Sequence, residues 1–209
     1  MKPTDAPDQI ARHRLLPVIA LHDADHATPL GHALIEGGLP VAEVTFRTDA
    51  AADSIRAMSR LDGLLVGAGT VVKPEQVDAA KDAGATFLVS PGTSASVVER
   101  AQQLDLPIFP GVATPTDIQL ALSLGLDTVK FFPAEAMGGI KTLKALAAPF
   151  PGVRFVPTGG IGTGNVGDYL ALPFVQACGG SWMVAPKLYA DGDFTAVNDA
   201  VREAVATIG

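Results

Sequence analysis

One lysine of this chain lies in a setting that favours nucleophilic chemistry. Lys130 is embedded in the apolar run Thr128–Pro133, whereas the other six lysines fall in the polar N-terminus, in loops or in expected helices. Burial disfavours the ammonium form of a lysine, and a neutral amine can attack a carbonyl carbon to form a Schiff base. The alternative is a structural lysine that reaches the end of its strand or pairs with a carboxylate.

A second apolar run carries three polar residues at alternate positions. Because side chains alternate along a strand, Glu43, Thr45 and Arg47 share one face. Val44 and Phe46 occupy the other face, which we expect to pack against helices. The polar face then points inward, where Glu43 could act as a general acid or base. The alternative is a buried ion pair between Glu43 and Arg47, although such pairs seldom stabilise more than apolar replacements would.

Three glycine-rich segments follow expected strands. Gly67–Thr70 offers small residues that leave room for a ligand, together with one hydroxyl group. Thr158–Ile161 and Gly179–Ser181 follow the seventh and eighth expected strands. Glycines let backbone N–H groups approach a phosphate closely, and a helix N-terminus favours the anion. One Gly-Gly pair is more often a tight turn, but two pairs at neighbouring strand ends favour a phosphate site.

Short runs rich in Val, Ile and Phe recur along the whole chain and are expected to be strands. Their centres lie about 20 to 26 residues apart, enough for one strand, one loop and one helix. The expected strands are Leu16–Leu21, Val41–Phe46, Leu64–Gly67, Thr86–Val89, Pro107–Phe109, Thr128–Phe132, Arg154–Pro157 and Phe174–Cys178.

The segments between these runs show helical spacing of apolar residues. Proline opens two of them, as is typical of the first turn of a helix. The expected helices are Ala27–Ile35, Pro74–Ala83, Ser94–Leu104, Pro115–Leu124, Ile140–Ala147 and Phe194–Thr207, with a further helix over residues 3–13.

Eight strand–helix units of similar length predict an α/β fold, a single (β/α)8 TIM barrel over residues 1–209. The extra N-terminal helix is expected to cover the base of the barrel. An open doubly wound sheet is the alternative, but no Gly-x-Gly-x-x-Gly follows the first strand, as a dinucleotide-binding version would require. No linker or low-complexity stretch marks a second domain.

A closed barrel of eight strands places the second and sixth strands opposite each other. Glu43 and Lys130 are therefore expected to face one shared cavity near the C-terminal ends of the strands. A direct ion pair would keep the lysine charged and quench its nucleophilicity. We therefore expect the carboxylate to act through water or substrate, with Arg47 offsetting its charge.

Composition excludes several classes of protein. The chain has 209 residues, of which 48% are hydrophobic and 18% charged, too apolar for a disordered chain. The net charge of -7 disfavours a general binder of nucleic acid or anionic membranes. A single cysteine, Cys178, excludes a disulfide framework and suits a reducing compartment. With no apolar core of a signal peptide near the N-terminus, we expect a soluble cytoplasmic protein.

The histidines give little support for a metal site. His22 and His26 flank two aspartates, but the simpler expectation is that Asp23 or Asp25 caps the next helix and that both histidines lie at the surface. Without a credible ligand cluster, metal-dependent chemistry is disfavoured and no metal is expected. Cys178 lies in an apolar run and is expected to be a buried core residue.

Six short motifs occur in order between residues 43 and 182, and the likeness that they carry runs from about residue 10 to residue 205. They are Glu43–Thr48, Gly67–Val71, Ser90–Gly92, Lys130–Glu135, Pro157–Ile161 and Gly179–Trp182.

With these motifs the chain resembles the 2-keto-3-deoxy-6-phosphogluconate (KDPG) aldolases, the class I aldolases of the Entner–Doudoroff pathway. The resemblance implies a homotrimeric barrel enzyme, an aldehyde-lyase that needs neither metal nor organic cofactor. It implies that Lys130 forms the Schiff base and that Glu43 is the general acid/base. The implied substrate-binding residues are Arg47 and Thr70 for the pyruvyl carboxylate, Pro91 and Phe132 for the pocket wall, Thr158 beside the reacting carbons, and Gly159, Gly160, Gly180 and Ser181 for the phosphate.

The implied reaction is cleavage of 2-dehydro-3-deoxy-6-phosphogluconate to pyruvate and D-glyceraldehyde 3-phosphate. A phosphorylated 2-keto acid is then the binding partner, with no nucleic acid or membrane. Three alternatives stay open at this point. The first is an aldolase for 4-hydroxy-2-oxoglutarate (KHG), or one acting on both substrates; the others are a phosphosugar epimerase or isomerase and a non-catalytic phosphometabolite binder.

Overall fold

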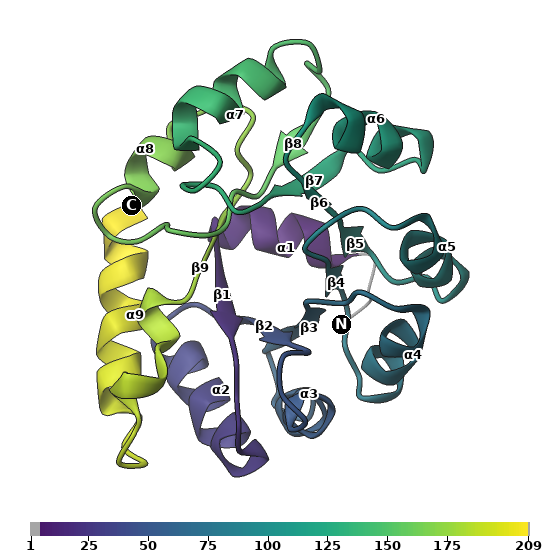
Figure 1. The fold of residues 1–209 in the computed structure, drawn as a ribbon. Coiled ribbons are helices and arrows are strands. Elements are labelled where there is room, and N and C mark those ends of the chain that lie inside the picture. Colours follow the sequence, from purple (N-terminus) through teal and green to yellow (C-terminus); the bar gives the residue numbers. More distant parts are fainter. Residues whose placement is uncertain (1–4, 209) are drawn as a thin grey trace.

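The computed structural model describes residues 5–208, and its parallel strands curl into a closed barrel surrounded by helices (Figure 1). Every pairing between neighbouring strands is parallel. The strands are β1 (Leu15–Ile19), β2 (Val41–Thr45), β3 (Leu65–Gly69), β4 (Leu88–Val89), β5 (Ile108–Phe109), β6 (Gly111–Val112), β7 (Thr128–Phe131), β8 (Arg154–Phe155) and β9 (Cys178–Gly180).

Two sets of paired strands complete the barrel. One runs in the order β5-β4-β3-β2-β1-β9 and the other in the order β6-β7-β8. β5 and β6 together form the fifth strand of the barrel, which is interrupted at Pro110. The β-bridge between Thr158 and Gly179 joins the segment after β8 to β9. The nine labels therefore describe eight positions, and β2 lies across the barrel from β7. The predicted (β/α)8 fold is confirmed.

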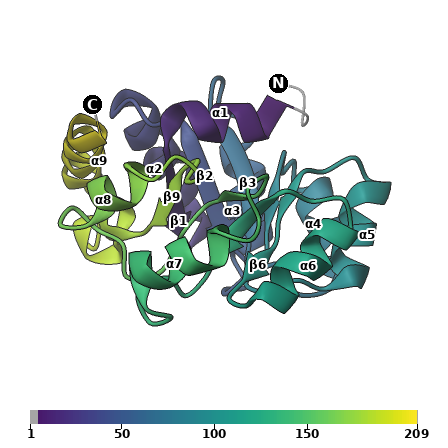
Figure 2. The same ribbon diagram turned by 90° about the horizontal axis from the view of Figure 1, so that it is seen from above.

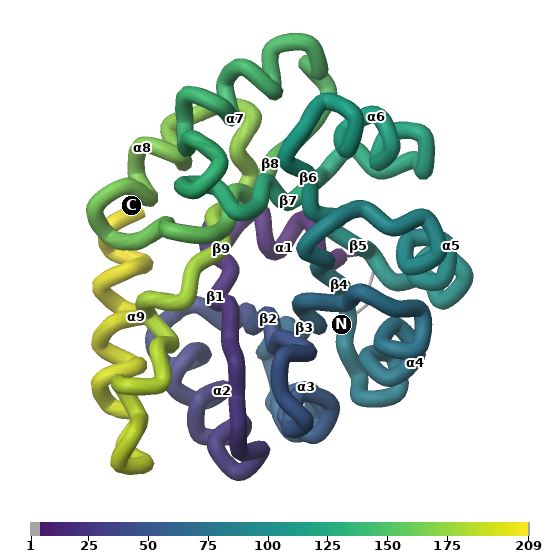
Figure 3. The backbone as a smooth tube through the Cα atoms, viewed as in Figure 1, coloured from purple at the N-terminus to yellow at the C-terminus, as the bar shows by residue number. Residues whose placement is uncertain are grey.

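The helices alternate with the strands around the barrel, as the backbone trace shows (Figure 3). Pro74 and Pro115 open their helices as expected, and Thr114 and Asp117 form a capping box before the second of these. The helices are α1 (Ala6–His13), α2 (Ala27–Glu36), α3 (Ala51–Met58), α4 (Pro74–Asp82), α5 (Ala95–Gln103), α6 (Pro115–Ser123), α7 (Gly139–Ala147), α8 (Val166–Leu170) and α9 (Thr195–Ile208), with single 3-10 turns η2 (Ala24–His26), η3 (Trp182–Val184) and η4 (Pro186–Leu188).

Helix α1 lies across one end of the barrel (Figure 2). It leads directly into β1, so this end holds the N-terminal ends of the parallel strands and is the base of the barrel. The expected helix over residues 3–13 is thus present from Ala6, and positions 3 and 4 lie outside the described residues. An apolar layer from α1 and the strands fills the base, formed by Ala6, Ile10, Leu16, Val41, Leu65, Phe87, Val89, Phe109, Val156 and Ala177.

The last barrel strand differs most from its prediction. Only Val175 of the expected strand Phe174–Cys178 bridges to Phe155, and the regular strand is β9, Cys178–Gly180. The pair Gly179-Gly180 therefore lies within the strand and does not follow it. Glycine has low strand propensity, which is why the sequence pattern places the strand too early.

One further strand boundary differs from its prediction, and two helices were not predicted. The fifth strand extends past Phe109 as β6 because the chain resumes pairing after Pro110, which lacks an N–H group. Helices α3 and α8 were not located individually from the sequence.

In the part of the chain that the structure describes, no helix has both the length and the apolar character needed to cross a membrane.

We predict that Cys178 is unreactive in the folded protein. Its side chain is fully buried at the start of β9, and burial raises the pKa of the thiol to about 12, so the reactive thiolate is scarce at neutral pH. A thiol reagent such as DTNB should therefore label the protein at pH 8 only after unfolding in guanidinium chloride. Labelling of the native protein at the rate of the unfolded chain would contradict this assignment.

Candidate active site

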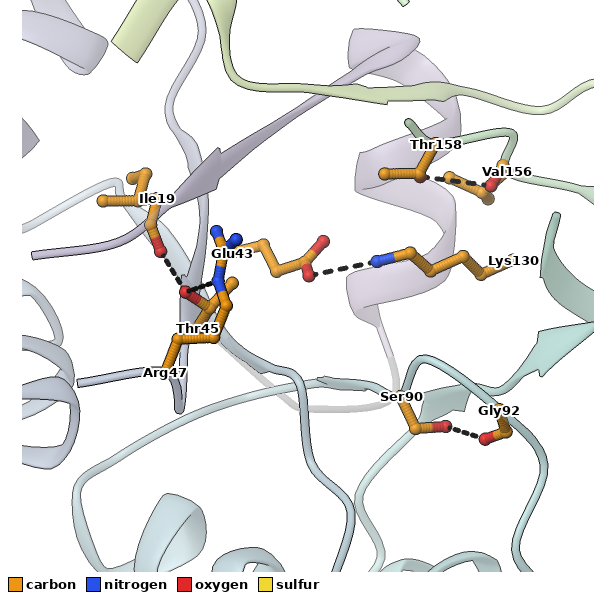
Figure 4. A network of polar contacts seen from close by, with 9 residues as sticks. All are labelled: Ile19, Glu43, Thr45, Arg47, Ser90, Gly92, Lys130, Val156 and Thr158. Carbon is orange, nitrogen blue, oxygen red and sulfur yellow. Dashed lines mark hydrogen bonds and ion pairs between the residues drawn. The ribbon is translucent and has the colours of Figure 1, made fainter. Parts of the chain in front are cut away.

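Lys130 and Glu43 meet inside the barrel (Figure 4). Lys130 is on β7 and Glu43 on β2, and the lysine Nζ donates a hydrogen bond to the carboxylate Oε1 at 3.4 Å. Lys130 is 6% exposed and Glu43 is 0% exposed. The expectation that these two residues share the barrel interior is confirmed.

The contact is direct, which corrects the expectation that the two groups form no direct ion pair. Its length of 3.4 Å exceeds that of an ordinary charge-assisted hydrogen bond. Phe132 adds a second favourable contact, since Lys130 Nζ lies 5.1 Å from the centre of its ring. The protein thus holds the amine in place while leaving the ion pair loose.

Arg47 does not offset the charge of Glu43 by contact. Within residues 5–208 it forms no ion pair with Glu43; its Nε donates to Thr45 Oγ1 at 3.0 Å. The Thr45 hydroxyl in turn donates to the Ile19 carbonyl oxygen at 2.8 Å (Figure 4). Thr45 therefore connects the Arg47 guanidinium to the backbone of β1 and fixes its orientation. This contact was not predicted from the sequence.

Glycines of β3 make room for side chains of the protein. A Cβ atom on Gly69 would lie 2.2 Å from Glu43 Oε1, and one on Gly67 would lie 2.4 Å from the Phe87 ring. From the sequence, Gly67–Thr70 was expected to leave room for a ligand. The structure corrects this expectation, because Glu43 and Phe87 already occupy the space.

The second carboxylate oxygen of Glu43 has no partner. Oε2 is buried and accepts no hydrogen bond from the described residues. Buried polar atoms are nearly always satisfied, so this oxygen is available to a group that enters the barrel interior. It can accept a proton from a group placed beside Lys130, which is the behaviour of a general base.

A cavity of about 160 Å³ opens at the C-terminal end of the barrel, beside the buried pair. Neither Lys130 nor Glu43 lines it, but two lining residues are their neighbours: the Phe132 ring lies 5.1 Å from Lys130 Nζ, and Val18 pairs in register with Glu43. Val18 and Ile161 were missed from the sequence, although alternation along β1 from the inward Leu16 could have indicated Val18. The lining residues are Val18, Arg47, Phe132, Thr158, Gly159, Gly160, Ile161, Gly180 and Ser181.

Seven of the predicted substrate-binding residues thus surround one cavity, and two do not line it. Thr70 follows β3 with a φ angle of 57°, a left-handed conformation that a β-branched residue rarely adopts. Pro91 follows β4, where its carbonyl oxygen lies close to Gly111. Both belong to the same end of the barrel as the cavity, because all of these strands are parallel.

The loop after β8 lines the cavity and has backbone amides without acceptors among the described residues. Gly159 and Gly160 have φ angles of 102° and 77°, which favour glycine strongly. The N–H groups of Gly159, Gly160 and Ile161 donate to no acceptor in the part of the chain described. Three free amides on one side of a cavity can bind a phosphate or carboxylate.

Other candidate ligands do not assemble. Among residues 5–208, no group of three or more His, Cys, Asp and Glu side chains is placed to hold a metal ion. Asp23 accepts a hydrogen bond from the Asp25 N–H group and so caps η2, as expected, and His22 is exposed. His26 is half-buried against Tyr189 and Phe194, which corrects the expectation of a surface histidine.

Comparisons with known proteins agree with this geometry. The family model described as "KDPG and KHG aldolase" matches residues 7–200. The 2-dehydro-3-deoxy-phosphogluconate aldolase of Haemophilus influenzae is 46% identical over 202 residues, which cover 96% of this chain and 95% of the relative.

Two solved structures are also similar. The KDPG aldolase of Zymomonas mobilis with 3-phosphoglycerate has a TM-score of 0.90 and 40% identity, covering 97% of this chain and 96% of the other. The KDPG aldolase of Legionella pneumophila, with pyruvate captured as a covalent carbinolamine, has a TM-score of 0.91 and 37% identity, covering 95% and 97%.

We predict that Gly69→Ala disrupts the buried pair. The added Cβ would collide with the Glu43 carboxylate, so the variant should lose about 1–3 kcal/mol of unfolding free energy, as overpacked interiors do. A crystal structure should show Glu43 displaced from Lys130. Gly152→Ala is the matched control, because that glycine is exposed and nothing lies within 4 Å of an added Cβ. Unchanged stability together with an intact contact in Gly69→Ala would refute the packing argument.

Proposed function

The chain belongs to the family of KDPG and KHG aldolases, and from this premise we propose that Lys130 is its Schiff-base nucleophile and Glu43 its general acid/base. The enzyme is a 2-dehydro-3-deoxy-phosphogluconate aldolase, which cleaves its substrate to pyruvate and D-glyceraldehyde 3-phosphate. Membership of an aldolase family excludes the two alternatives that the sequence left open, a phosphosugar epimerase or isomerase and a non-catalytic phosphometabolite binder.

One observation carries the assignment of roles: a buried lysine and a buried carboxylate in contact at 3.4 Å, next to a cavity at the C-terminal end of the barrel. A loose pair of this kind can pass a proton from the ammonium group to the carboxylate. The product of that transfer is a neutral amine beside a neutral carboxylic acid, both ready to react.

The first half of the reaction forms the imine. Lys130 Nζ attacks the C2 carbonyl carbon of the substrate, and the resulting carbinolamine loses its hydroxyl as water after Glu43 returns a proton to it. The product is a protonated imine, which can accept an electron pair. The Phe132 ring, 5.1 Å from Nζ, favours this positive charge.

The second half breaks the carbon–carbon bond. Glu43 removes the proton from the C4 hydroxyl group, the C3–C4 bond cleaves, and its electrons move into the C2–C3 bond of an enamine. D-Glyceraldehyde 3-phosphate leaves. Glu43 then protonates C3, and water hydrolyses the imine to release pyruvate and regenerate Lys130.

The remaining predicted residues bind the two ends of the substrate in this proposal. Arg47, oriented by Thr45, and Thr70 take the carboxylate of the pyruvyl half. Pro91, Phe132 and Thr158 enclose the reacting carbons. The loop of Gly159 and Gly160, together with Gly180 and Ser181, takes the phosphate, a role supported by its free amides and by the cavity that it lines.

We extend the proposal to 4-hydroxy-2-oxoglutarate as a second substrate, because the matching family model includes KHG aldolases. This compound has the same 2-keto group and 4-hydroxyl group, on which Lys130 and Glu43 act. We also propose a homotrimer of single-domain barrels (residues 1–209) working in the cytoplasm. The trimer and the cytoplasmic location are what membership of this family implies.

We predict that Lys130→Arg abolishes aldol cleavage. The variant retains a positive charge opposite Glu43 but cannot form an imine, so turnover should fall by orders of magnitude while the circular dichroism spectrum is preserved. Lys144→Arg, on the exposed face of α7, is the matched control and should retain full turnover. Substantial cleavage by Lys130→Arg would remove this lysine from the mechanism.

We predict that Glu43→Gln slows turnover by about 100- to 10,000-fold, the usual contribution of general acid–base catalysis. Glutamine preserves size and hydrogen bonding but cannot accept a proton at neutral pH. Exchange of the methyl protons of pyruvate, followed by NMR in D2O, should slow as well, whereas some imine should still form. A purely structural Glu43 would give the opposite pattern, a lower melting temperature with normal exchange.

We predict that Ser181→Ala weakens binding of the phosphorylated substrate. Loss of one hydrogen bond to a charged group should raise its KM about tenfold, with little effect on the KM for pyruvate in methyl exchange. Ser123→Ala, on the exposed surface of α6, serves as the control. Equal increases for both compounds would show that Ser181 supports the fold or the chemistry and not phosphate binding.

A further inference from the structure

A carboxylate lies close to the proposed phosphate loop and has no role in the reaction described above. Glu135 follows β7 by four residues, is exposed overall and does not line the cavity. The hydroxyl group of Tyr169 on α8 nevertheless donates a hydrogen bond to its Oε1. Tyr169 itself is 0% exposed, so this contact joins the segment after β7 to the packed interior beneath α8.

The side chain of Glu135 packs against the Thr158–Ile161 loop, the proposed phosphate site. A Cβ atom on Gly160 would lie 2.6 Å from Glu135 Cβ and 2.7 Å from its Cγ, so the methylene groups pack directly against this glycine. The backbone strengthens the contact: the Ala134 N–H group donates to the Thr158 carbonyl at 2.8 Å, and the Glu135 N–H group to the Gly159 carbonyl at 3.0 Å.

The charged end of Glu135 is directed elsewhere. A Cβ atom on Gly139, the first residue of α7, would lie 3.0 Å from Glu135 Oε1 and 3.2 Å from the Tyr169 hydroxyl oxygen. The carboxylate therefore lies at the N-terminus of α7, where the helix dipole stabilises negative charge. Burial and the neighbouring carboxylate raise the pKa of Tyr169, so its hydroxyl remains a donor at neutral pH.

The position of the Glu135 carboxylate keeps its negative charge away from the loop amides. A carboxylate free to move under the amides of Gly159 and Gly160 would compete with a phosphate for them and repel it. Tyr169 and the N-terminus of α7 hold the Glu135 carboxylate away from the loop, so that only the Cβ and Cγ atoms of Glu135 contact Gly160. The far side of the loop is fixed separately, since Asn165 Nδ2 donates to the Gly160 carbonyl at 3.1 Å.

We propose that Glu135 and Tyr169 are positioning residues that hold the Thr158–Ile161 loop in its anion-binding conformation. This role rests on the proposed function of that loop as the phosphate site. Neither residue touches the reacting carbons. Their loss should therefore change the binding of the phosphorylated end of the substrate and leave the chemistry at Lys130 unaltered.

The first test compares kinetic constants of Tyr169→Phe with those of the parent enzyme. This variant loses only the hydroxyl group and preserves the packed ring. The KM for the phosphorylated substrate should rise about three- to tenfold, the worth of one hydrogen bond, with little change in kcat. The KM for pyruvate in methyl exchange should stay at the parental value, because pyruvate has no phosphate. Unchanged KM for the phosphorylated substrate, or equal changes for both compounds, would overturn the proposal.

The second test uses Glu135. Glu135→Gln preserves both the acceptor for Tyr169 and the methylene contact with Gly160, so its KM for the phosphorylated substrate should stay near the parental value. Glu135→Ala removes the acceptor and the Cγ atom, keeping only Cβ against Gly160, and should raise this KM at least as much as Tyr169→Phe. Because the residues act through one contact, the double variant Tyr169→Phe/Glu135→Ala should be no worse than Glu135→Ala alone. Additive effects would overturn the coupling.

Failure of this inference is distinguishable from failure of the proposed function. Ser181→Ala reports on phosphate binding at the loop independently of Glu135. A phosphate-specific effect in Ser181→Ala with none in Tyr169→Phe would reject the positioning role and leave the phosphate site intact. The absence of a phosphate-specific effect in both variants would reject the phosphate site itself, and the positioning role with it.

Discussion

A lysine and a glutamate from opposite sides of the barrel meet in its interior, and both are almost completely removed from water. Burying two charges is costly, and their mutual attraction repays this cost only with good geometry. Here the geometry is loose at 3.4 Å, and one oxygen of Glu43 is left unpaired. Stability alone does not account for such a pair, whereas a site that moves protons requires it.

The surrounding structure is organised around this contact. Apolar side chains and α1 close the base, and the cavity opens at the opposite end of the barrel. Gly69 lacks a side chain where the Glu43 carboxylate lies, and Gly179 lacks one where the Thr158 hydroxyl lies. The cavity then presents cationic Arg47 and a loop of free amides to an anionic ligand, in a protein whose net charge is -7. Local donors overcome the unfavourable global charge.

Much of this could be predicted from the sequence because it depends on periodic patterns. Apolar runs at regular spacing predicted the barrel, and a single lysine in such a run predicted Lys130. Alternation along one strand placed Glu43 inside. The position of β9 was wrong because its glycines have low strand propensity, although they are required there by the close approach of Thr158 and Trp182.

Other features depend on distances that no sequence pattern encodes. The direct contact of Glu43 with Lys130 follows from the packing of side chains across the barrel. The contact between Glu135 and Tyr169 joins residues 34 positions apart, one of them exposed, so nothing in the local sequence distinguishes it from an ordinary surface glutamate. Such contacts are visible only once the loops are folded against each other.

Covalent attachment of Lys130 to the substrate is tested most directly by mass spectrometry after reductive trapping. The enzyme is incubated with pyruvate and sodium borohydride, digested, and the modified peptide is sequenced. We expect one reduced pyruvyl adduct per chain, located on Lys130. An adduct on any other lysine, or no adduct under conditions in which the enzyme turns over, would contradict it.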